Sequence, residues 1–150
     1  MAVVLIVLGG ALCGFRGLGM LGVSALGSWR VCFRYALAVM LLFTGSAHFT
    51  SVKEILVRMA PPWVPEPRLV IFVTGILEIL GAIGLLIPGL QRPAGIALGL
   101  FFIAVLPANI YAAHAGLLLG GQPATPVWIR VPIQMVFIAL AWWSTQPAVK

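Results

Sequence analysis

Long apolar stretches separated by short polar connections dominate the chain. A helix needs about 20 mostly apolar residues to cross the hydrocarbon core of a bilayer, where every backbone polar group must be satisfied without water. Four stretches meet or approach that length: residues 29–49, 69–87, 93–113 and 127–144. The pattern therefore predicts four membrane-spanning helices.

The first 27 residues are also apolar but harder to assign. Residues 2–15 are slightly short for a span, Arg16 interrupts them, and glycines recur up to Gly27. The stretch Val23-Ser24-Ala25 resembles a signal-peptide cleavage site, yet no basic residue precedes the apolar run. We favour a fifth membrane helix in residues 1–27, beside a four-helix domain in residues 28–150. A half-inserted segment and a cleaved signal peptide are the alternatives.

Composition supports an all-α integral membrane protein. Hydrophobic residues make up 62% of the chain and charged residues only 8%, whereas a soluble domain carries about 25% charged residues. The net charge of +6 could indicate nucleic acid, but the basic residues mostly flank apolar runs and form no patch. We therefore expect the lipid bilayer as the partner, and no nucleic acid.

The basic residues give a weak indication of orientation, because cytoplasmic connections carry more lysine and arginine. Four core spans place four such residues on each side, Arg30, Arg34, Arg92 and Lys150 on one and Lys53, Arg58, Arg68 and Arg130 on the other. Arg16 joins the first group if the N-terminal segment turns back there. This favours a cytoplasmic C-terminus modestly and places the proline-rich connection, residues 50–68, outside.

Glu78 lies in the middle of the second predicted span, where an acidic side chain costs about 2.5–3.5 kcal/mol. Small residues allow other helices to approach closely, so we expect Glu78 to face the bundle interior. It is a candidate proton carrier or ligand anchor. The alternative is a structural partner for an arginine, asparagine or glutamine. Its neighbours three and four residues away are all small: Thr74, Gly75, Gly81 and Ala82.

The third predicted span combines polar residues with a proline. Asn109 shares a helical face with Gly95 and Gly99, so we expect it to point inward. Pro107 removes the hydrogen bond to the Ile103 carbonyl, which then needs another donor. The sequence therefore predicts a polar wall on this helix.

Further polar residues fall in the same half of the bilayer if the helices alternate in direction, with Glu78 nearer the middle. We expect a polar pocket that opens towards the proline-rich connection, with Trp63 as a candidate lid. The plainer alternative is that these side chains cap helices, join helices by hydrogen bonds or lie at the membrane interface. The residues are His48, Asn109, Tyr111, His114 and Gln134.

The sequence disfavours most metal and redox-cofactor sites. Cys13 and Cys32 are far apart and form no CxxC pair, and no zinc, dinucleotide or phosphate-binding motif occurs. His48 and His114 could ligate haem from two helices, but His114 is expected at a helix end. With three acidic residues and no carboxylate-histidine repeat, a di-iron centre is less favoured still. We therefore predict no metal site; quinone is the cofactor that we consider, and haem is disfavoured.

A family resemblance is carried by five short segments: GSAHF (45–49), APPWVPEP (60–67), TGILEILGAIGLLIP (74–88), PANIYAA (107–113) and RVPIQMVFIALAWW (130–143). Together they resemble the DoxX-like family of small bacterial multi-pass membrane proteins, over about residues 29–143. The resemblance implies a four-helix bundle in the bacterial cytoplasmic membrane. It also implies a redox association, since the family is named after a small subunit of a thiosulfate:quinone oxidoreductase. On motif position, the matching residues are His48, Glu78, Pro107, Asn109, Tyr111 and Gln134.

The leading hypothesis is a membrane subunit of a redox or respiratory complex, with a soluble oxidoreductase subunit as a further partner. In this hypothesis Glu78 and His48 carry out proton chemistry beside a quinone-like headgroup. The alternative is a non-enzymatic scaffold or assembly partner. A small transporter is less favoured, because the inner half offers little polar surface beyond Arg34. The expected ligand-binding residues are Asn109, Tyr111, Gln134, His114 and Trp63.

Overall fold

The computed structural model describes residues 1–119 and 121–146. It is helical apart from a hairpin of two very short strands, β1 (Leu118–Leu119) and β2 (Gln122–Pro123). Within the described residues, five helices are long and apolar enough to cross a membrane. The prediction of an all-α, multi-pass membrane protein is therefore confirmed. The helices are α1 (Ala2–Met20), α2 (Trp29–Ala47), α3 (Lys53–Met59), α4 (Pro67–Leu86), α5 (Gln91–His114) and α6 (Val127–Thr145), with a short 3-10 helix at Ser24–Leu26.

The four predicted spans correspond to α2, α4, α5 and α6, and their ends lie within two residues of the prediction. Helix α4 begins at Pro67, whose fixed φ suits the first helical turn. Glu66 before it has a φ of 47°, and this left-handed conformation turns the chain from the proline-rich connection into the helix. Gly89, with a φ of 88°, makes the tight turn between α4 and α5, a conformation that glycine adopts without steric cost.

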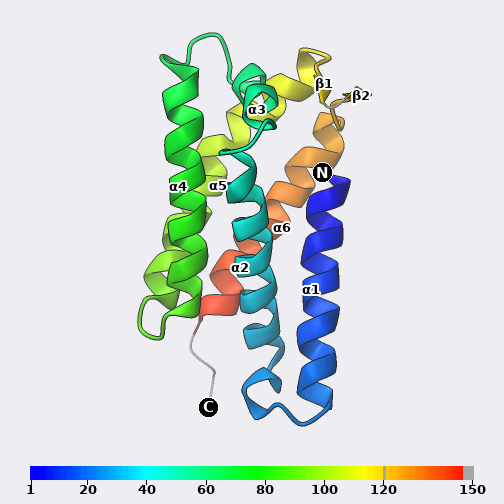
Figure 1. The fold of residues 1–150 in the computed structure, drawn as a ribbon, viewed down its shortest axis with the longest axis vertical. Helices are drawn as coiled ribbons and strands as arrows, with labels where there is room; N and C mark the ends of the chain where they lie inside the picture. The colour runs from blue at the N-terminus through cyan, green and yellow to red at the C-terminus, as the bar shows by residue number, and fades with distance from the viewer. Residues whose placement is uncertain (120, 147–150) are drawn as a thin grey trace.

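The five long helices lie side by side (Figure 1). Helix α2 is central, because it packs against α1, α4 and α6. Of the residues in its apolar stretch, 39% are buried, compared with 6% for α1. Contacts between α4 and α5 and between α5 and α6 close the four-helix bundle. Helix α1 packs against α2 on the outside of this bundle (Figure 1). The fold is thus a four-helix bundle with an additional N-terminal hydrophobic helix, as expected.

The core of the bundle consists of small and aliphatic side chains with two aromatic rings. On the outer faces, large apolar side chains such as Leu80, Leu100 and Trp142 are exposed. In water such faces would be unfavourable, but they suit contact with lipid chains. The core residues include Ala36, Leu37 and Leu41 of α2, Ala82 and Leu85 of α4, Leu98 and Phe102 of α5, and Phe137 and Ala141 of α6.

Arg16 does not end the N-terminal helix, which continues to Met20. Its Nη1 donates a hydrogen bond to the Gly27 carbonyl at 3.0 Å, and its guanidinium lies 4.8 Å from the Trp29 ring centroid. The charge is therefore satisfied at the turn between α1 and α2 without interrupting the helix. The orientation of the bundle stays a prediction, and Lys150, one of the residues on which it depends, lies outside the described residues.

Candidate functional site

Two glycines allow α2 and α4 to approach closely beside Glu78. A Cβ atom at Gly75 would lie 2.5 Å from the His48 Cβ, and one at Gly45 would lie 2.9 Å from the Ile79 Cγ1. Because carbon atoms in contact are about 3.5–4.0 Å apart, neither position has room for a side chain. The close crossing sets the His48 side chain, at the end of α2, against the first half of α4.

His48 is held in place by the backbone of α4. Its Nδ1 lies 2.7 Å from the Ile71 carbonyl oxygen, and a carbonyl oxygen only accepts, so Nδ1 carries a proton. The Thr74 hydroxyl donates to the same carbonyl at 2.9 Å and lies 3.3 Å from Nδ1. The other ring nitrogen, Nε2, is left free to face Glu78. It is an acceptor in the neutral ring and a donor in the protonated ring.

Glu78 faces this free nitrogen of His48. Its Oε2 lies 4.0 Å from Nε2, and the two side chains are only 13% and 10% exposed. Among the described residues Oε2 is buried without a hydrogen-bond partner, which is uncommon for a buried polar atom. Since 4.0 Å is too long for a direct hydrogen bond, His48 does not satisfy this oxygen.

A cavity of about 430 Å³ lies against this pair. Its volume falls within the range of about 300–1,000 Å³ that is usual for small-molecule sites, which are mostly apolar with a few polar groups. Trp63 lies at its edge, is 72% exposed and meets the Tyr111 ring edge-on with 6.4 Å between centroids. The polar lining comprises His48, Thr74, Glu78 and Asn109, and the apolar lining includes Leu56, Met59, Trp63, Leu77, Phe101 and Ala104.

Asn109 is oriented by a hydrogen-bond network that joins α5 to α6. Its Oδ1 accepts from Arg130 Nη1 at 2.9 Å, and its Nδ2 donates to Gln134 Oε1 at 3.5 Å. Arg130 Nε donates to the Thr125 carbonyl at 2.9 Å, and Gln134 Nε2 donates to the Phe102 carbonyl at 2.9 Å. Arg130 and Gln134 are only 2% and 3% exposed. The network therefore lies behind the cavity wall and fixes the side chain of Asn109.

A side-chain donor is expected at the Ile103 carbonyl, but the donor from α6, the Gln134 amide, bonds to the carbonyl of the preceding residue, Phe102. Helix α5 continues through Pro107 to its last residue, and the Gln134 amide bonds to the Phe102 carbonyl at 2.9 Å. Pro107 lacks the N–H that would bond to the Ile103 carbonyl, so the proline does not by itself account for the bond to Phe102. The side chain arrives one residue earlier than the proline alone predicts.

The structure brings some of the predicted site residues together and separates others. His48, Glu78, Asn109 and Trp63 line the cavity, and Tyr111 adjoins it through its ring contact with Trp63. Gln134 and His114 do not line it. Gln134 differs from the expectation because its face of α6 is directed at α5. His114 differs because it is the exposed last residue of α5. Among the described residues, no three His, Cys, Asp or Glu side chains are grouped to hold a metal ion.

Two further residues of the site are Thr74 and Arg130. In the sequence, Thr74 counts only as a small neighbour of Glu78, and Arg130 only as an orientation signal. A usable signal existed for Arg130, because it lies four residues before Gln134 and therefore on the same helical face. Thr74 depends on the approach of His48 from another helix, which no pattern within α4 indicates.

A family model matches residues 37–145, and the family is described as a domain of unknown function (DUF8561). Because the match covers more than half of the chain, the chain belongs to this family. The matched range contains most of α2 and all of α3 to α6, and thus every residue that lines the cavity. No curated protein and no solved structure matches the chain.

Proposed function

We propose that the protein is a membrane subunit of a redox or respiratory complex and binds a quinone-like headgroup in the cavity beneath α3. One observation carries the proposal: His48 and Glu78 from one side and Asn109 from the other meet at a single, otherwise largely apolar cavity. A quinone ring needs apolar surfaces for its faces and hydrogen-bond donors for its carbonyl oxygens. The cavity offers both.

Asn109 is suited to donate to a quinone carbonyl. Arg130 has only donors, so the atom that accepts from it is the Asn109 oxygen, and the amide nitrogen takes the other position. That nitrogen has two hydrogens, and one of them is directed to Gln134. The second hydrogen is available for a ligand in the cavity that Asn109 lines.

His48 and Glu78 are suited to supply protons. Reduction of a quinone to a hydroquinone adds two electrons and two protons, so the site needs proton donors as well as a carbonyl contact. A protonated Glu78 carboxyl group and a His48 imidazolium would each give one proton to the reduced quinone, and both groups would then take up a proton from water. The electrons would come from a soluble oxidoreductase partner. We propose the bacterial cytoplasmic membrane as the location of the protein.

The proposed relation to the DoxX-like family agrees with this assignment. The segments that carry the resemblance contribute His48, Trp63, Glu78 and Asn109, all of which line the cavity. The redox role in the proposal comes from the resemblance, and the ligand site in the proposal is the cavity.

The proposal is tested by titrating the purified protein with a tailless quinone, such as a dimethoxy-methyl-benzoquinone. We expect Glu78→Gln and His48→Gln each to weaken binding about tenfold, which corresponds to about 1.4 kcal/mol. Glu54→Gln and His114→Gln are matched controls, because both residues are exposed and neither lines the cavity. If the four variants remain folded and bind with the same affinity as the unaltered protein, the proposal is wrong.

A second candidate function is a non-enzymatic scaffold or assembly partner. The observation that favours it is the buried network of Arg130, Asn109 and Gln134, which holds α5 and α6 together without any ligand. In that case Glu78→Gln would lower the melting temperature in detergent, and no quinone would bind to either form.

A further inference from the structure

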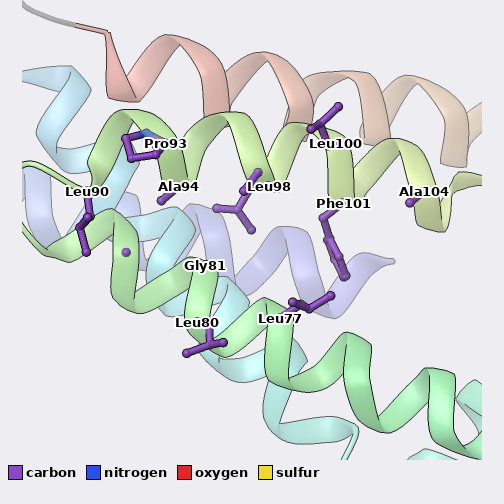
Figure 2. Close-up of a pocket in the computed structure, with 12 residues that line it drawn as sticks. Leu77, Leu80, Gly81, Leu90, Pro93, Ala94, Leu98, Leu100, Phe101 and Ala104 are labelled. Atoms are coloured by element: carbon purple, nitrogen blue, oxygen red, sulfur yellow. The ribbon is translucent and has the colours of Figure 1, made fainter.

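A second cavity, of about 570 Å³, runs between α4 and α5. Its lining residues are leucine, glycine, alanine, proline and phenylalanine, with no charged side chain among them (Figure 2). It shares Leu77, Phe101 and Ala104 with the polar cavity. In Figure 2, Leu77 and Phe101 lean towards one another from the two helices, where α4 and α5 diverge. The two cavities therefore adjoin at these three residues, and we refer to them together as one groove, polar beneath α3 and apolar towards the α4–α5 turn.

The apolar part of the groove is a shallow channel open to the outside of the bundle. Leu80 and Leu100 on its walls are exposed, as is Ala97 along its length. Its floor is closed because the helices touch there, and a Cβ atom at Gly84 would lie 2.8 Å from the Ala94 Cβ. Small residues thus leave a hollow along the helix pair that is accessible from the lipid.

We propose that the ligand of the polar cavity carries a long apolar tail of the isoprenoid kind, and that this tail lies in the α4–α5 groove. The inference rests on the proposed function, because it assigns the tail of the quinone whose headgroup contacts His48, Glu78 and Asn109. The tail leaves the polar cavity past Leu77 and Phe101 and follows the groove towards Leu90.

The charge of the polar cavity distinguishes this ligand from a phospholipid. Its lining includes the acidic residue Glu78 and neither lysine nor arginine. A phosphate headgroup would lie beside the Glu78 carboxyl group with no lysine or arginine in the lining to offset its charge, whereas the carbonyl oxygens of a quinone carry no net charge. A neutral headgroup with one apolar chain therefore fits both parts of the groove.

The tail contributes by packing and not by the hydrophobic effect, because the lipid that it leaves is as apolar as the groove. A side chain that fills the groove should therefore change the affinity for the tailed ligand more than a longer tail would. Ala97 is the position for this test, since it lines the apolar cavity but not the polar one. Ala139 of α6 is the matched control, since it is also exposed and lines neither cavity.

The experiment compares two probes, a tailless benzoquinone and the same ring with two isoprene units, in lipid nanodiscs. We expect Ala97→Phe to reduce the ratio of tailed to tailless affinity about tenfold, or about 1.4 kcal/mol, and Ala139→Phe to leave the ratio unchanged. A tailed probe with a photoreactive terminal group should label peptides of α4 and α5 that contain Leu80 and Leu100.

The outcomes separate the two proposals. If neither probe binds the unaltered protein, the proposed function fails and the tail assignment fails with it. If the tailless probe binds but Ala97→Phe leaves the ratio unchanged, or the photoreactive probe labels α1 or α6, the headgroup site stands and the tail assignment is wrong.

Discussion

Replacement of Gly75 by alanine tests the closest contact between α2 and α4. The new Cβ would lie 2.5 Å from the Cβ and 2.9 Å from the Cγ of His48, whereas carbon atoms in contact are about 3.5–4.0 Å apart. The helices must then separate by about 1 Å, and overpacking of this size costs about 1–3 kcal/mol. Relative to alanine at an unhindered helical glycine, we expect Gly75→Ala to lower the free energy of unfolding in detergent by that amount and to move His48 away from Glu78.

The control is Gly99→Ala in α5, where an added Cβ would meet no atom within 4 Å. Both substitutions gain helix propensity of up to about 1 kcal/mol, so the difference between them isolates the steric cost. Unfolding by a denaturing detergent in mixed micelles, followed by circular dichroism, measures both variants. If Gly75→Ala proves as stable as Gly99→Ala, the close crossing of α2 and α4 at this position is refuted.

Two further substitutions test the polar contacts. Gln134→Leu removes the amide donor to the buried Phe102 carbonyl at 2.9 Å, and we expect a loss of about 0.5–2 kcal/mol in thermal melts. The exposed neighbour Met135 provides the control Met135→Leu, and identical melts for the two variants would count against the buried bond. Arg68→Ala breaks the 3.0 Å ion pair with Glu54, in which both side chains are exposed, so we expect less than about 1 kcal/mol. A larger loss would mean that this pair anchors α3.

The positions of the membrane helices could be predicted closely, because hydropathy and length are local properties of the chain. The inward direction expected for Glu78 agrees with its low exposure, since the small residues at one helical turn from it already mark the face that packs. Arg16 illustrates a limit of such local arguments. Its charge argues against a continuous first helix, but contacts with Gly27 and Trp29 on the following turn satisfy it.

The partners of the buried polar residues were less accessible to prediction. A single helix pattern tells which face is polar, but not how two helices are rotated about their axes or how closely they approach. The placement of Gln134 and His114 outside the cavity lining reflects this. Two side chains at the same depth in the bilayer need not line the same cavity.

The sequence by itself determined the class of the protein, the spans of its helices and the inward direction of Glu78, because each follows from the cost of placing a chemical group in hydrocarbon. Only the tertiary structure decided that Glu78 faces His48, that Arg130 orients Asn109, and that an apolar groove continues from their cavity. The physical reason is that these pairings depend on the close contact at Gly75 and on the packing of α5 against α6. Such contacts join residues far apart in the chain.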